Sequence, residues 1–330
     1  MNFDFVGIGD IVVDSFIELA QATVNDTPNG KTITMPFADK IPFKSEKIVS
    51  GVGNSANACV SAARLGLKTA FFGIIGTDHY GELCKSVLDR EAITPFLEYS
   101  TLQTNHHIVL SYQAERTILV NHQAYDYSKL LAQLSTLTIK TLYISSLSPD
   151  ASILYPGILE YCTSHPETYL VFQPGTFQLK NSQDPTIKEL YKRCNLLVVN
   201  KEEAELVTTM PHNTPINLLA KKLHEIGPDT LAITDGPAGS YLSHMSEIFY
   251  LPQYPDIAPP IERTGAGDAF ASTLASYITK GFKPLDALMR APINSMNVVQ
   301  HTGAQVGLLT SEAIENYLAH APTTYKIQKV

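Results

Sequence analysis

Hydrophobic and polar positions along this chain alternate between two kinds of pattern. Short apolar runs that end at glycine, proline or a polar residue are typical of buried strands, and the stretches between them have the apolar spacing of helices. Strands are predicted at 3–9, 68–75, 141–146, 168–172, 195–199 and 230–234. Helices are predicted up to residue 65 and at 81–91, 151–163, 184–193, 201–208, 214–226, 266–280, 284–300 and 311–320, with a hairpin at 239–251. This alternation predicts an α/β fold with a doubly wound, mostly parallel sheet flanked by helices.

Two regions depart from the alternation. Residues 11–48 hold an extended run and then a stretch rich in turn formers, and residues 104–123 hold two β-rich runs at hairpin spacing. We expect these segments to form a small β-rich lid, while residues 1–10, 49–103 and 124–330 form the core. The lid would cover the C-terminal edge of the sheet, where such folds bind ligands.

Composition narrows the possible partners. The chain has 330 residues, 44% of them apolar and 17% charged, with a net charge of −8 and no Lys/Arg-rich run. These values predict a globular protein with neither a nucleic-acid partner nor a membrane partner. The start of the chain lacks a basic segment, and the four cysteines (Cys59, Cys84, Cys162 and Cys194) are scattered without metal-ligand spacing. We therefore expect buried thiols and a cytoplasmic location.

Candidate chemistry is concentrated in residues 263–270, where small residues and an acid begin a predicted helix. Thr264 is placed to cap the helix, and the amides of Gly265, Ala266 and Gly267 can approach an anion closely. Asp268 would repel that anion unless it acts as a base that takes up a proton while charge develops nearby. The simpler alternative is a glycine-rich helix start whose acid interacts with the helix dipole.

Four motifs in order resemble those of the ribokinase family, the PfkB sugar and nucleoside kinases that include adenosine kinase. The segment 264–270 (TGAGDAF) resembles the family's C-terminal signature, and 53–57 (GNSAN) followed by 63–66 (ARLG) resembles the N-terminal signature. Residues 200–203 (NKEE) match an NxxE motif, and 234–239 (TDGPAG) match a TxGxxG nucleotide loop. The resemblance runs essentially from end to end and implies a ribokinase-like fold.

Carried onto the acceptor side, the resemblance implies that Asp268 is the catalytic base on the acceptor hydroxyl. Gly265, Ala266 and Gly267 would form the anion hole for the migrating phosphoryl group. The acceptor itself would be bound by Asp14, Asp10, Gly53 and Asn57.

On the nucleotide side, the resemblance implies ATP and Mg²⁺, with a monovalent cation as a further candidate cofactor. Asn200 and Glu203 would organise Mg²⁺ and phosphates through water, with no direct protein ligand to the metal. The other nucleotide- or phosphate-binding candidates are Thr234, Gly236, Gly239, Asn297, His301, Gly303 and Arg116. Some have simpler interpretations: Asn200 and Glu203 could only cap a helix, Gly236 and Gly239 could only form a turn, and His301 could be a packing residue.

Three departures from the family pattern affect the choice of acceptor. Glu262 replaces a usual aspartate, Val52 replaces a usual glycine, and Ser145 and Ser146 stand where ribokinases place a glutamate on ribose. The sequence thus predicts transfer of the γ-phosphoryl group of ATP to a primary hydroxyl of a small sugar or sugar-like metabolite. A nucleoside kinase resembling adenosine kinase is the alternative, and a non-catalytic binding relative is a third possibility. A homodimer formed through the lid is a further expectation.

Overall fold

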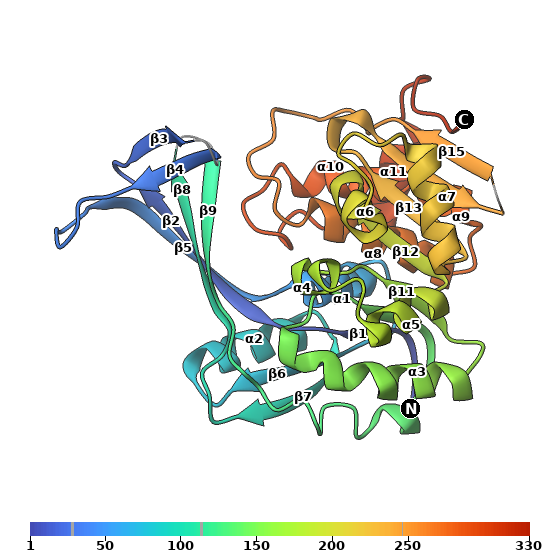
Figure 1. Ribbon diagram of the computed structural model, residues 1–330, viewed down its shortest axis with the longest axis horizontal. Helices are drawn as coiled ribbons and strands as arrows, with labels where there is room; N and C mark the ends of the chain where they lie inside the picture. The colour runs from blue at the N-terminus through green and yellow to red at the C-terminus, as the bar shows by residue number, and fades with distance from the viewer. Residues whose placement is uncertain (28–29, 113–114, 246) are drawn as a thin grey trace.

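The computed structural model of this chain describes residues 1–27, 30–112, 115–245 and 247–330. Its main sheet has ten strands in the order β16-β15-β14-β13-β12-β11-β10-β1-β6-β7 (Figure 1). Seven strands are parallel: β1 (Asn2–Ile8), β6 (Thr69–Gly76), β7 (Thr94–Ser100), β10 (Thr138–Ile144), β11 (Tyr169–Phe172), β12 (Leu196–Asn200) and β13 (Thr230–Thr234). The antiparallel remainder is β14 (Ser240–His244), β15 (Glu247–Leu251) and β16 (Gln328–Lys329). The predicted doubly wound, mostly parallel sheet is confirmed.

Helices cover both faces of this sheet, and each face has its own hydrophobic core. One face packs against α3 (Leu154–Ser164), α5 (Pro185–Arg193), α6 (Lys201–Thr208) and α7 (Ile216–Ile226), with the short α4 (Thr176–Lys180) nearby. The other face packs against α1 (Asn54–Arg64), α2 (His79–Arg90), α8 (Ala266–Thr279), α9 (Pro284–Leu288), α10 (Ala291–Val298) and α11 (Ser311–Ala319). All four cysteines are buried and free, as expected. None of the helices in the described ranges is long and apolar enough to cross a membrane.

The structure corrects some predicted elements. Strand β7 was not predicted, because it is a half-buried edge strand with Pro95 near its start rather than a continuous apolar run. The single helix expected at 284–300 is two helices, α9 and α10, and Pro292 lies in the first turn of the second. The helix expected at 151–163 begins as a 3₁₀ turn, η2 (Pro149–Ile153).

A second sheet projects from one side of the core (Figure 1). It contains β2 (Val12–Leu19), β5 (Phe43–Val52), β8 (His106–Tyr112) and β9 (Glu115–Asn121) in the order β5-β2-β8-β9. A separate hairpin, β3 (Thr23–Thr27) and β4 (Gly30–Thr34), lies between β2 and β5 in the chain. These strands come from the two segments predicted as a lid, although β5 continues beyond the predicted boundary at residue 48. The turn residues 113–114 of the predicted hairpin lie outside the described residues.

Candidate active site

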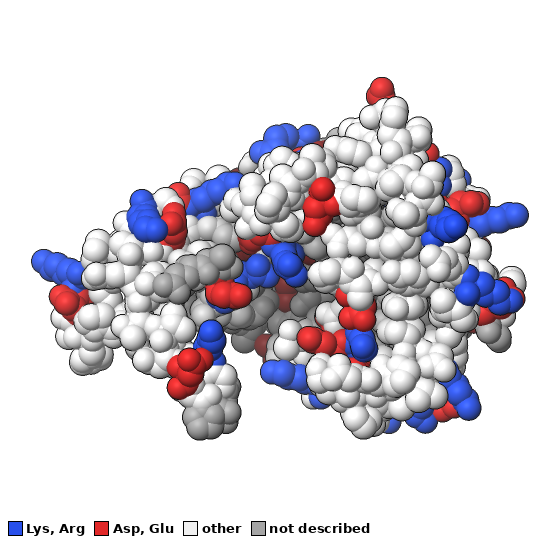
Figure 2. Space-filling view, turned by 90° about the horizontal axis from the view of Figure 1, so that it is seen from above, with Lys and Arg blue, Asp and Glu red and all other residues white. Residues whose placement is uncertain are grey.

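The cavity that contains the predicted acceptor-binding residues, named the acceptor cavity for that reason, lies between the two sheets at the C-terminal ends of the parallel strands. Figure 2 shows a hollow between the projecting sheet and the larger body of the molecule. The second sheet contributes Asp14 and His107 to the lining, and the core contributes the start of α1 and the loop before α8. Among the predicted site residues, this cavity brings together Asp10, Asp14, Gly53, Asn57, Arg116, Glu203, Gly265, Gly267 and Asp268.

Asp268 lies in the first turn of α8 and is buried where that helix meets the start of α1. Its Oδ1 accepts hydrogen bonds from Asn54 Nδ2 at 2.8 Å and from Gln173 Nε2 at 3.1 Å, and its Oδ2 accepts one from Asn57 Nδ2 at 2.8 Å. Burial raises the pKa of Asp268, while these three amides oppose the rise by stabilising the carboxylate. The charged form is thus surrounded by donors, as a base requires.

The turn before Asp268 depends on glycine at one position in particular. Gly265 is the N-cap of α8 and has a φ of 83°, and a Cβ there would collide with Ala304. The space beside Gly267 is open, since the nearest atom to a Cβ would be Gln173 Nε2 at 3.8 Å. First-turn amides of a helix have no intrahelical acceptor, so this end of α8 presents donors and positive potential to the cavity.

Both polar atoms of the Asn57 side chain form hydrogen bonds to other side chains, although Asn57 was predicted to bind the acceptor. Its Nδ2 donates to Asp268, and its Oδ1 accepts from Gln305 Nε2 at 3.0 Å. Gln305 also donates to the carbonyl of Gly51 at 2.7 Å, which fixes the pair. In the structure, Asn57 therefore links Asp268 to Gln305. Gly53 is required for close packing, because a Cβ at its φ of 122° would collide with the carbonyl oxygen of Asp10.

Two carboxylates and two imidazoles form the other wall of the cavity. His107 Nδ1 lies 3.3 Å from Asp14 Oδ1, and His122 Nδ1 lies 3.8 Å from Asp10 Oδ2. Burial raises the pKa of Asp10 to about 6. A 2.6 Å hydrogen bond from the Tyr127 hydroxyl opposes this rise, because it stabilises the carboxylate. Within the described part of the chain, Asp10 Oδ2, Asp14 Oδ1 and His107 Nε2 are buried without a hydrogen-bond partner.

His107 was not among the site residues predicted from the sequence. Asp14 lies opposite it in the second sheet, where β2 pairs with β8 in parallel and Asp14 is in register with His107. His122 was missed because it belongs to no motif. Asn54 lies within the 53–57 motif, but it acquires its partner, Asp268, only through tertiary packing.

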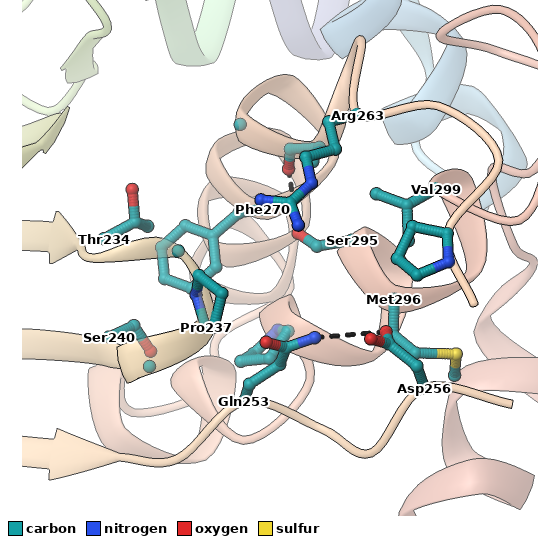
Figure 3. A pocket seen from close by; sticks show the side chains of 16 residues that line it. Thr234, Pro237, Ser240, Gln253, Asp256, Arg263, Phe270, Ser295, Met296 and Val299 are labelled. Carbon is teal, nitrogen blue, oxygen red and sulfur yellow. Dashed lines mark hydrogen bonds between the residues drawn. The ribbon is translucent and has the colours of Figure 1, made fainter. Parts of the chain in front are cut away.

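A second pocket, mostly apolar, lies on the other side of the start of α8 (Figure 3). Three predicted nucleotide residues line it, namely Thr234, Gly236 and Gly239. The remaining wall is formed chiefly by apolar side chains that were not predicted: Pro237, Pro260, Phe270, Pro292, Met296 and Val299.

Three other nucleotide-binding candidates, Asn297, His301 and Gly303, lie outside this lining. Asn297 Nδ2 donates to the carbonyl of Gly307 at 2.7 Å, and Gly303 N donates to Glu262 Oε2 at 3.1 Å. The ring of His301 packs close to Gly307. The face of α10 that meets the pocket carries Met296, one position before Asn297.

A third, polar cavity continues from the second toward Asp268. It is lined by Asn200, Glu203 and Gln173 together with the backbone of Ala266 and Gly267. Asn200 and Glu203 do form a capping box, with two reciprocal 2.8 Å hydrogen bonds between backbone amides and side-chain oxygens. They also line the cavity, so the capping and ligand interpretations are compatible. Burial raises the pKa of Glu203, and the nearby charge of Asp268 adds to the rise.

Arginines approach the acceptor cavity from two directions. Arg116 reaches the cavity from β9, and its Nη1 lies 4.0 Å from Glu262 Oε1. Glu262, which stands where an aspartate is usual, therefore forms an ion pair with the second sheet. Arg263 lines both the acceptor cavity and the apolar pocket, and Figure 3 shows its side chain extending into the latter. Arg263 was not predicted, because it precedes the recognisable motif.

Comparisons with known proteins identify the family of this chain. The family model described as pfkB family carbohydrate kinase matches residues 43–311. A ribokinase of Bacillus subtilis is 28% identical over 81% of this chain and 87% of its own length. A 5-dehydro-2-deoxygluconokinase of Clostridium beijerinckii is 24% identical over 98% of this chain and 95% of its own length.

Solved structures show the same fold. Arabidopsis thaliana ribokinase, complexed with ribose and ATP, superposes with a TM-score of 0.78 at 19% identity over 96% of this chain and 99% of that one. Cryptococcus neoformans ribokinase, in complex with ADP, gives a TM-score of 0.72 at 21% identity over 94% of this chain and 98% of that one. The matched motifs, the family model and the fold agree with one another. The chain therefore belongs to the pfkB family of carbohydrate kinases, phosphotransferases whose acceptor is an alcohol group.

Proposed function

We propose that this protein transfers the γ-phosphoryl group of ATP to a primary hydroxyl of a small, neutral sugar, with Asp268 as the base. The observation that carries the proposal is the position of Asp268 and the adjoining amides. The loop and first turn that contain them form a wall shared by the acceptor cavity, the apolar pocket and the polar cavity between them. A hydroxyl in the first cavity and a phosphate in the third would meet beside this carboxylate.

Phosphoryl transfer passes through a loose transition state, so positioning and charge neutralisation contribute more than base strength. Amides of Gly265, Ala266 and Gly267 would stabilise negative charge on the migrating group. Asp268 would hold the acceptor hydroxyl in line and take up its proton as the new P–O bond forms. Entry of the acceptor would require Asp268 to share or exchange one of its three amide contacts.

The chemistry of the acceptor cavity favours a sugar over a nucleoside. Ionised Asp10 and Asp14 can only accept hydrogen bonds, so their unpartnered oxygens require donors such as hydroxyl groups. They would also repel a sugar acid. No Phe, Tyr or Trp among the described residues lines this cavity, so no broad aromatic face is available for a nucleobase.

The two remaining cavities fit a nucleotide. The apolar pocket suits a flat base, and the polar cavity beside it holds Asn200 and Glu203 at the position expected for phosphates. A Mg²⁺ ion bound there through water would neutralise phosphate charge, and Glu203 is one of the carboxylates that line that cavity. Thr234 and the backbone of Gly236 would position the nucleotide. Dependence on a monovalent cation stays a prediction.

We also propose that the second sheet acts as a lid and as a dimer surface. It contributes Asp14, His107 and Arg116 to the acceptor cavity, so closure over a sugar would exclude water. Its edge strand β9 exposes Ile118, Leu119 and Val120, an unusual run of apolar residues for a free edge. A second copy of the chain would cover this run.

The test is acceptor-dependent release of ADP from ATP and Mg²⁺ across a matched panel. The panel would contain neutral pentoses and hexoses, sugar acids, sugar phosphates and purine nucleosides. We expect turnover with one or more neutral sugars and none with the other classes. Preferred turnover of a nucleoside would establish the alternative function, and ATP binding without any turnover would favour a non-catalytic relative.

A further inference from the structure

The side-chain amide of Gln173 links helix α8 to strand β10, because it contacts both Asp268 and Tyr143. Gln173 directly follows β11 and lines both the acceptor cavity and the polar cavity. Its Nε2 donates to Asp268 Oδ1 at 3.1 Å, and its Oε1 accepts a hydrogen bond from the hydroxyl of Tyr143 in β10. A buried tyrosine of the main sheet is thus linked through one side chain to the proposed base.

Chemistry fixes the direction of every hydrogen bond in this link. An ionised carboxylate only accepts, so the end of Gln173 that faces Asp268 must be its NH₂ group. The other end is then a carbonyl oxygen, which also only accepts, and the Tyr143 hydroxyl must donate to it. Burial raises the pKa of Tyr143 far enough that the hydroxyl keeps its proton at all ordinary pH values.

We infer that Gln173, held in this orientation by Tyr143, is a positioning residue that keeps Asp268 ionised and fixes its rotamer. This inference rests on the proposed function of Asp268. A side chain of the same size that cannot donate would leave Asp268 Oδ1 with Asn54 alone. A glutamate at position 173 would place a second negative charge beside the base.

Other charged groups around Asp268 do not replace this contact. Glu203 at the start of α6 lies near enough for the charge of Asp268 to raise its pKa, and Arg263 precedes Asp268 in the loop. Helix α1 carries its one charged residue, Arg64, at the far end, and α10 has none. Across the cavity lie Asp10, Asp14, His107, His122 and Arg116. Direct stabilisation of the carboxylate therefore comes from the three amides.

The test is the carboxyl titration of Asp268 in the ligand-free protein, followed by ¹³C NMR and assigned with Asp268→Asn. We expect Gln173→Leu to raise the midpoint by about one pH unit, Gln173→Glu to raise it further, and Tyr143→Phe to give a smaller rise. In the pH profile of kcat/KM for the preferred acceptor, the acid limb should shift to higher pH, and the sizes of the shifts should follow the same order among the variants. In Gln173→Leu, kcat should fall roughly tenfold.

Tyr161→Phe is the matched control, because Tyr161 is another buried tyrosine and donates to the carbonyl of Leu137 at 3.0 Å, away from the cavities. It should lower stability without moving the titration. Binding of ADP, measured by calorimetry, shows that each variant is folded. An unchanged midpoint in folded Gln173→Leu and Gln173→Glu would overturn the inference. A shifted midpoint in a protein that phosphorylates no acceptor would instead overturn the proposed function.

Discussion

The acceptor cavity and the apolar nucleotide pocket share one wall but are built differently. The nucleotide pocket is lined by residues 234 to 299, while the acceptor cavity takes its lining from residue 10 to residue 304 and from both sheets. The first is mainly apolar, and the second contains four carboxylates, two imidazoles and two guanidinium groups. The shape of the apolar pocket thus suits a ligand with a flat apolar part. The acceptor cavity would instead select its ligand by hydrogen bonds.

This difference has a consequence for folding and for specificity. A pocket made from one stretch of chain depends on a few neighbouring elements, so changes elsewhere should leave it intact. The acceptor cavity needs the long-range pairing of β2 with β8 and of α1 with α8. Substitutions should therefore separate acceptor binding from nucleotide binding in most cases, with the shared wall as the exception.

The largest effect is expected for Asp268→Asn. Loss of the base should lower kcat by roughly 10³-fold or more, because proton removal and alignment of the hydroxyl fail together. Binding of ADP should change little, since the apolar pocket does not include this side chain. Single-turnover kinetics and calorimetry would measure the two effects. Near-native turnover in this variant would remove Asp268 from the mechanism.

The next largest effect is expected for Arg263→Gln, because Arg263 lines both sites. Loss of a cation from the wall shared by the two sites should raise KM for ATP and lower kcat, by roughly tenfold each. Affinity for adenosine, which carries no phosphate charge, should fall less than affinity for ATP, so a comparison of ATP, ADP and adenosine tests the assignment. Arg90→Gln, an exposed arginine at the end of α2, is the control. Equal losses for adenosine and ATP would contradict a phosphate contact.

Asp14→Asn should affect the acceptor side only. The variant loses a charge-assisted hydrogen bond to a hydroxyl, so KM for the sugar should rise roughly tenfold while KM for ATP is unchanged. Asp89→Asn, an exposed acid paired with Lys85 on α2, is the control. A rise in both KM values would show that the two sites are not separable here.

Asp10 should give a pH-dependent effect on stability. Burial raises its pKa to about 6, above the ordinary value of 3.8, so this group's stabilising contribution is present at low pH and is lost as pH rises through that interval. Asp10→Asn should therefore be more stable than the native chain by about 3 kcal/mol at pH 7.5, with little difference at pH 4. Urea unfolding at the two pH values measures this. A variant less stable at pH 7.5 would mean that ionised Asp10 is stabilising.

The smallest effect on activity is expected for Val120→Lys on the exposed edge of the lid. Val120 is 60% exposed, and a charge there should prevent a second copy from pairing with β9. Light scattering should show a dimer in the native chain and a monomer in the variant, with modest change in kcat. Leu218→Lys on α7, at a position 46% exposed, is the control. A native monomer would refute the dimer.

Much of the core could be predicted from the sequence, because buried parallel strands and amphipathic helices have local patterns. Strand β7 was missed since a half-buried edge strand lacks such a pattern. The presence of Met296 rather than Asn297 in the lining of the apolar pocket was not predicted for a related reason. Helical spacing locates a helix, but only packing against α8 decides which of its faces meets a pocket.

The base and its glycine turn were apparent from a short contiguous stretch, since an amide-rich helix start followed by an acid is a local feature. The surroundings of that acid were not apparent. Asn54, Gln173 and Gln305 converge on Asp268 and Asn57 from distant positions, and His107 meets Asp14 only through strand register. Backbone conformation and burial pattern depend on neighbours in the chain, whereas hydrogen-bond partners depend on how the elements pack. For this reason the reaction class could be predicted from local motifs, while the support of the base and the walls of the acceptor cavity appeared only in the folded structure.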